Sequence, residues 1–127
     1  MKFASPPDLP VPHGYSQVVT VPAGTQVWVS GQVGAAADGH VPSGWEAQTR
    51  LAFSNVGRAL ASAGASWHDV FKLTTYVVDM SELATVRRVR DEFVSRSSPP
   101  ASTLVQVTAL VRPELLIEIE AVAVLRT

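Results

Sequence analysis

Two glutamates stand in the middle of an apolar stretch near the end of the chain, in the segment Ile117-Glu118-Ile119-Glu120. Side chains two residues apart in a strand point to the same face, so Glu118 and Glu120 are expected to lie together. A carboxylate among apolar neighbours is costly unless it is solvated or hydrogen-bonded. It can hold a water molecule, or act as a general base with a raised pKa. Taken alone, the strand favours a solvated stripe at a sheet edge.

Two other segments combine glycine with polar side chains, His13-Gly14-Tyr15-Ser16-Gln17 and Val29-Ser30-Gly31-Gln32. A glycine inside a strand often marks the close approach of a ligand or of another backbone, and it also occurs at simple bulges. Ser30 and Gly31 are therefore candidates for either. The surroundings of Tyr15 are typical of a core aromatic with its hydroxyl at the rim.

A short basic cluster, Arg87, Arg88 and Arg90, stands on an expected helix that also carries Glu82 and Asp91. Such a mixture is typical of a solvated helix face with ion pairs. Nucleic-acid binding is the weaker interpretation, because no aromatic residues are interleaved with the arginines. The net charge of −1 likewise gives no general field that would attract nucleic acid or an anionic membrane.

Composition narrows the class of protein further. The chain has 127 residues, 46% of them hydrophobic, which fits a single domain over residues 1–127. Because cysteine is absent, there is no disulfide, thiolate metal site or cysteine nucleophile. The histidines His13, His40 and His68 lack ligand spacing, so no metal site is expected. The sequence shows neither a signal peptide nor an apolar run of roughly 20 residues, and a cytoplasmic location without membrane binding is expected.

The first half of the chain must position the first candidates. Segments 17–21 and 26–33 are strand-like, and the proline and glycine between them predict a hairpin. Ser43 and Glu46 have capping-box spacing, which predicts that a helix begins there. Gly64 is placed to end this helix in a left-handed cap.

The second half repeats the alternation of strand and helix. Residues 67–78 predict a strand, and Asp79 or Ser81 can cap a second helix. Strands over 103–109 and 115–125 follow. The buried stripe of the second helix is expected to be Leu83, Val86, Val89 and Phe93. The order ββαβαββ predicts an α+β protein in which two helices cover one face of a mixed sheet.

The second face of that sheet also carries apolar residues. In the last strand, Val122 and Val124 alternate with Ile119 and Ala121. Because no element remains to cover this face, we expect self-association to bury it. A valine-rich but solvated face is the alternative.

Together these segments resemble the RidA/YjgF reactive-intermediate deaminase family over nearly the whole chain. The resemblance rests on several short motifs in the right order. They are Gly14-Tyr15-Ser16-Gln17, Val29-Ser30-Gly31-Gln32, Asn55 with Ala63-Gly64, Asp69 to Asp79, Pro100-Ala101-Ser102-Thr103 and Ile117 to Ala123. It implies a fold like that of chorismate mutase, a homotrimer, and active sites in the clefts between subunits.

The resemblance also implies an activity. Family members of the deaminase type hydrolyse small imines and enamines, such as 2-aminoacrylate, without a cofactor. The matching positions are Glu118 for orienting the attacking water, and Tyr15, Ser30 and Gly31 for shaping the pocket. Glu120 is the neighbour of Glu118 on the same strand face.

One functional position departs from the family pattern. The arginine that grips the substrate carboxylate in the family is Ser102 here, and the residue two beyond, often cysteine, is Leu104. Ser102 and Thr103 offer neutral donors in place of a bidentate cation. Arg87, which stands where the family often has asparagine, or Arg112 can supply another cation. The preferred interpretation is a substrate without a carboxylate.

Three functions therefore stay open. The first is hydrolysis of a C=N bond in a small metabolite, and the second is a trimeric module that binds a metabolite without turnover. The third, cleavage of RNA with inhibition of translation, is disfavoured by the net charge.

Overall fold

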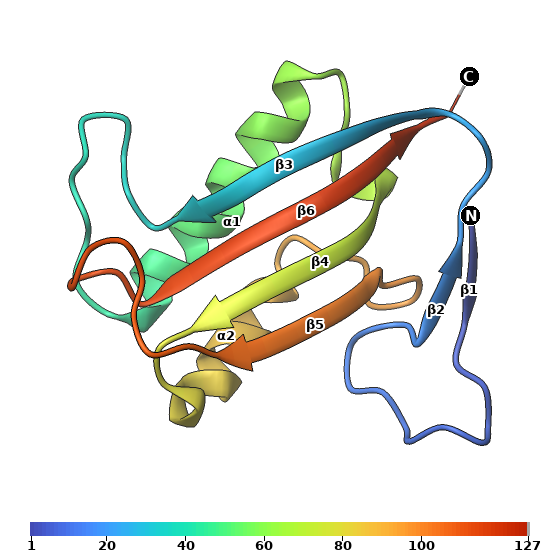
Figure 1. Ribbon diagram of the computed structural model, residues 1–127, viewed down its shortest axis with the longest axis horizontal. Coiled ribbons are helices and arrows are strands. Elements are labelled where there is room, and N and C mark those ends of the chain that lie inside the picture. The colour runs from blue at the N-terminus through green and yellow to red at the C-terminus, as the bar shows by residue number, and fades with distance from the viewer. Residues whose placement is uncertain (127) are drawn as a thin grey trace.

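The computed structural model describes residues 1–126 and is shown in Figure 1. Its elements in chain order are β1 (Lys2–Ala4), β2 (Val18–Thr20), β3 (Thr25–Val33), α1 (Trp45–Ser62), the 3₁₀ turn η1 (Trp67–Asp69), β4 (Val70–Val77), the 3₁₀ turn η2 (Met80–Glu82), α2 (Leu83–Arg90), β5 (Ala101–Gln106) and β6 (Ile117–Leu125).

A four-stranded sheet in the order β3-β6-β4-β5 forms the body of the molecule. Strands β4 and β5 are parallel and the other neighbours are antiparallel, so the sheet is mixed as predicted. Both helices lie behind it, and its other face is left open (Figure 1). The α+β class and the two helices on one face are therefore confirmed.

The hairpin predicted between segments 17–21 and 26–33 does not form. Strand β2 pairs with β1, which the sequence analysis did not predict, and these two form a separate small sheet. Strand β3 pairs with β6, and β6 lies between β3 and β4 instead of beside β5. The physical reason is burial: Ile117, Ile119, Ala121 and Ala123 of β6 are nearly inaccessible to solvent. A strand of this kind is most stable at the centre of a sheet, with neighbours on both sides.

The core lies between the helices and the covered face of the sheet. Phe53, Val56 and Leu60 of α1 are fully buried against it, and Val86 and Val89 of α2 complete the packing. The rest of the predicted stripe, Leu83 and Phe93, is only half-buried, because α2 begins at Leu83 and ends before Phe93.

The predicted helix ends are partly confirmed. Gly64 has a φ of +77° just beyond α1, as expected of a left-handed cap. The capping box of Ser43 and Glu46 does not form, because the residue before the helix is Gly44 with a φ of +92° and no side chain caps there. Asp79 accepts a hydrogen bond from the Ser81 amide, and thereby caps the short turn that leads into α2.

The strand predicted over 67–78 begins three residues later, at Val70, because residues 67–69 form η1. An irregularity between Val70 and Lys72 shifts the pairing with β6. Val70 therefore shares the buried side with Leu73, although strict alternation places the two on opposite faces.

Candidate functional site

A cavity of about 240 Å³ lies between α2 and the β4–β5 edge of the sheet. Its inner wall is apolar and includes Leu73 of β4 and Leu83 and Val86 of α2. Its polar lining comes from four separate segments of the chain, which are the segment before β2, β4, α2 and β5. The polar residues of the lining are His13, Tyr15, Thr75, Arg87, Arg90 and Ser102.

The segment before β2 reaches this cavity because it is fastened beside the start of β5. The Ser16 amide donates to the Pro100 carbonyl over 3.1 Å, and the Ser16 hydroxyl donates to the Pro99 carbonyl over 2.6 Å. Ser16 is buried, whereas its neighbour Tyr15 is half-buried and lines the cavity. These contacts bring Tyr15 to the same cavity as Ser102, although the two residues are 87 positions apart in the sequence.

Strand β5 divides its side chains between the two faces of the sheet. Ser102 pairs in register with Leu73 and lies with it on the covered face, where Ser102 and Leu104 line the cavity. Thr103 is exposed on the open face and accepts a hydrogen bond of 2.7 Å from the Lys72 ammonium. The predicted group Ser102, Thr103 and Leu104 is thus split by the alternation of the strand.

The three arginines of α2 do not behave as one solvated face. Arg88 is exposed and pairs with Glu46 of α1, as expected. Arg87 and Arg90, three residues apart on the same side of the helix, line the cavity. Arg112 does not: it donates to the Gly39 carbonyl over 3.0 Å and pairs with Glu114.

Arg90 is a cavity residue that the sequence analysis missed. Its side chain is 15% exposed, and its guanidinium pairs with Asp91 at 3.1 Å. The guanidinium also packs so closely on Gly14 that a Cβ built on this glycine would lie 2.0 Å from Nη2. His13, which the sequence suggested was uninvolved, also lines the cavity. The spacing of Arg87 and Arg90 at i and i+3 was the available signal.

Glu118 and Glu120 share one face of the sheet, as their spacing predicted, and the structure shows that this is the open face. Residue Glu118 pairs in register with Tyr76, and Glu120 pairs with Thr74. The Tyr76 hydroxyl donates a hydrogen bond of 2.7 Å to Oε1 of Glu120. This hydrogen bond, together with partial burial and the negative charges of both glutamates, raises the pKa of Tyr76 above its usual 10.0.

The segment Ser30-Gly31 forms an irregularity in the β3–β6 pairing, between Val29 and Gln32. Ser30 is exposed there, and Gly31 leaves the space that the Glu118 carboxylate occupies. Gly31 was interpreted as either a bulge or a place of close approach. The structure shows a bulge at Gly31, and the carboxylate of Glu118 lies against this glycine.

The candidates therefore form two groups on opposite faces of one sheet. Tyr15, Arg87, Ser102 and Leu104 line the cavity on the helix side of the sheet. Glu118, Glu120 and Thr103 lie on the open side, together with Gly31. A single chain does not bring Glu118 to the cavity. Within residues 1–126, no three His, Cys, Asp or Glu side chains gather so as to hold a metal ion.

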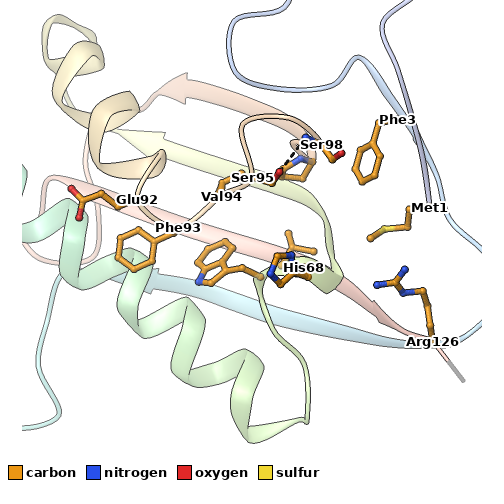
Figure 2. Close-up of a pocket in the computed structure, with 12 residues that line it drawn as sticks. Met1, Phe3, His68, Glu92, Phe93, Val94, Ser95, Ser98 and Arg126 are labelled. Atoms are coloured by element: carbon orange, nitrogen blue, oxygen red, sulfur yellow. Dashed lines mark hydrogen bonds between the residues drawn. The ribbon is translucent and has the colours of Figure 1, made fainter.

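A second and larger cavity, of about 530 Å³, lies beyond the C-terminal end of α2 (Figure 2). Figure 2 shows His68 and Phe93 on one side of it, and Phe3 and Met1 on the other. None of the candidate site residues lines this cavity.

Known proteins resemble this chain along nearly its whole length. The family described as Endoribonuclease L-PSP matches residues 8–125. The mouse protein named 2-iminobutanoate/2-iminopropanoate deaminase is 36% identical over 112 residues, which cover 87% of this chain and 80% of the mouse protein. No helix within residues 1–126 is long and apolar enough to cross a membrane.

Two solved structures agree with these matches. YyfB of Yersinia pestis, a Rid-family protein of unknown function, is 34% identical with a TM-score of 0.85, covering 96% of this chain and 97% of YyfB. Escherichia coli TdcF, solved with bound serine, is 30% identical with a TM-score of 0.74, covering 99% and 100%. The fold is that of a mixed sheet backed by two helices, shared with these proteins. The chain belongs to the RidA/YjgF family.

Proposed function

We propose that this protein hydrolyses the C=N bond of a small imine, or of the imine tautomer of an enamine. In this reaction water adds to the carbon of the C=N bond, a proton passes to the nitrogen, and the resulting carbinolamine expels ammonia to leave a carbonyl. Family membership and the name of the mouse relative support the reaction class. The observation that carries the proposal is the half-buried Glu118 carboxylate, held against Gly31, where it can orient a water molecule.

The proposed active site requires a second copy of the chain. The two groups of candidate residues lie on opposite faces of the sheet, so Glu118 of one copy is proposed to complete the cavity of another. The open face supports association, because Trp28 is 73% exposed in the strand beside Val122. Following the family resemblance, the assembly is proposed to be a homotrimer with the site in the cleft between subunits.

The substrate is proposed to differ from the usual 2-imino acids in how it is held. Ser102 and Thr103 offer only neutral donors, and Thr103 faces away from the cavity. A net hydrogen bond between neutral groups contributes about 1 kcal/mol, and one to a charged group about two to three times as much. A substrate held by position 102 alone would therefore bind roughly five- to thirtyfold more weakly than one held by an arginine there.

A non-catalytic module that binds a metabolite is the second candidate, and the absence of an arginine at position 102 favours it. Cleavage of RNA, which the family description suggests, is disfavoured by the net charge of −1.

Ammonia release from freshly generated imines tests the proposal. One substrate is 2-aminoacrylate, and the other is an imine without a carboxylate, generated by an amine oxidase. The protein should accelerate hydrolysis of at least one, and Glu118→Gln should abolish the acceleration without unfolding the chain. Glu114→Gln is the matched control, because it removes an exposed carboxylate whose ion pair contributes little. Silence on both imines, with tight binding of a metabolite, would favour the binding module.

A further inference from the structure

Arg87 is the cation of the cavity that has no partner of its own. Within residues 1–126, its guanidinium forms neither an ion pair nor a hydrogen bond with another side chain, whereas Arg88 pairs with Glu46 and Arg90 with Asp91. Arg87 is also half-buried. A partly buried arginine that has no carboxylate partner is available to bind an anion that reaches the cavity.

The surroundings of Arg87 are suited to an anion. A shallow hollow of about 400 Å³ adjoins the 240 Å³ cavity beside α2. The hollow and this cavity share His13, Arg87 and Arg90. Arg96 also lines this hollow, and Asp91 is its one carboxylate. Three arginines therefore surround a single acidic group, and Arg90 is fixed in place by Asp91 and Gly14. Cations held in fixed positions attract an anion without having to be ordered first.

The inner part of the cavity is suited to an apolar group. Leu73, Leu83 and Val86 line it, and Leu104 occupies the position where the family often has cysteine. Its volume of about 240 Å³ lies below the range of roughly 300–1,000 Å³ that is typical of sites for drug-sized ligands. The ligand should therefore be a small metabolite with an anionic end and a short apolar side chain.

We propose that Arg87, with Arg90 beside it, binds the carboxylate of the substrate in place of the residue at position 102. In the family pattern the anion-binding arginine stands on the strand that corresponds to β5, whereas here it stands on α2. The cavity then takes a small imino acid with a branched or linear apolar side chain. The sequence favoured a substrate without a carboxylate because no cation stands at position 102, and two cations on α2 remove that reason. This inference rests on the proposed hydrolysis for its substrate, although the anion site itself is testable without turnover.

Binding of two stable carbonyl compounds tests the proposal directly. The probes are 4-methyl-2-oxopentanoate and 4-methyl-2-pentanone, which share an apolar tail and differ in the carboxylate, and binding is measured by calorimetry on the intact assembly. The oxo acid should bind at least roughly tenfold more tightly than the ketone. Arg87→Gln should remove that preference, and Arg88→Gln, one position away on the outer side of α2, should leave it unchanged.

Two outcomes would overturn the proposal: equal affinity for the two probes, or an unchanged preference in a folded Arg87→Gln protein. Preferential binding of the oxo acid through Arg87 without hydrolysis of any imine would instead contradict the proposed function and leave the anion site in place. Hydrolysis of uncharged imines alone, with no preference for the oxo acid, would overturn the anion site and support the proposed hydrolysis.

A rescue experiment tests whether Arg87 serves the position of the missing arginine. Ser102→Arg should restore the preference for the oxo acid when it is added to Arg87→Gln, because both residues line the same cavity. A folded double variant without the preference would show that the two positions serve different sites, and would overturn the substitution of one for the other.

Discussion

The carboxylate of Glu118 lies directly against the Cα of Gly31, on the open face of the sheet. A Cβ atom built on Gly31 would lie 2.1 Å from Oε2 of Glu118 and 2.7 Å from its Cδ. The pairing of β3 with β6 shifts at this point, so that the glycine is presented to the glutamate of the neighbouring strand. The bulge thus determines where the carboxylate can rest.

Gly31→Ala should displace this carboxylate while leaving the fold intact. Gly31 does not have a positive φ, so alanine fits the backbone, and the group in its way is the end of a flexible side chain. A displacement of about 1 Å can cost a reaction roughly 100-fold. We expect imine hydrolysis to fall by that order, with an unchanged thermal unfolding midpoint. Full activity in the alanine variant would show that the resting place of Glu118 is unimportant.

The hydrogen bond from Tyr76 to Glu120 should be visible in a titration. It raises the pKa of Tyr76 above 10.0, and its loss in Glu120→Gln should bring that pKa down toward its usual value. Because the chain has two tyrosines, Tyr15→Phe leaves Tyr76 as the single tyrosine to follow by tyrosinate absorbance. Since a raised pKa in the folded state adds stability below pH 10 and loses it above, the folded protein should weaken as Tyr76 ionises. An identical titration with and without Glu120 would contradict the contact.

Charge placed on the open face should prevent association. Trp28 is 73% exposed beside Val122, and burying it against another copy is favourable only while it remains apolar. We expect Trp28→Glu to sediment as a monomer and to lose activity, while the original chain sediments as a larger species. Val11→Glu is the control, because Val11 is 76% exposed outside the strands. A monomeric original chain with full activity would contradict the need for a second copy.

Features that depend on local patterns could be predicted from the sequence. Glu118 and Glu120 share a face because strands alternate, and Gly64 ends α1 because glycine tolerates the left-handed conformation. Which strands pair depends on burial summed over the whole chain. No local signal showed that β6 would separate β3 from β4, or that β2 would pair with β1.

The candidate site shows the same division between local and long-range information. Motif by motif, the sequence indicated Tyr15, Arg87 and Ser102, and the structure places all three on one cavity. The sequence could not show that Glu118 lies on the open face, away from this cavity, because that depends on the pairing of β6 with β4. Arg90 was missed because it also fits an ion-paired surface helix. Its spacing from Arg87 was a weak signal, and its contact with Gly14 is visible in the structure alone.

The ion pairs that join α1 to α2 and to the turn after α2 should make stability depend on pH in the acid range. Arg88 lowers the pKa of Glu46 below its usual 4.5 through a hydrogen bond and its charge, and Arg50 lowers the pKa of Glu92 in the same way. A carboxyl whose pKa is lower in the folded state adds stability above its unfolded pKa, and this stability is lost as the pH falls through the folded value.

Glu46→Gln should therefore lower the thermal unfolding midpoint slightly at pH 7. The two proteins should converge as the pH falls from 4.5 through the lowered pKa of folded Glu46, because below that pKa Glu46 is protonated in both states. High salt should also reduce the difference at pH 7, because the pair is exposed and screened. The measurement is the unfolding midpoint of both proteins across the acid range at low and high salt. A difference that persists unchanged at low pH would mean that Glu46 stabilises the helices through packing and not through its charge.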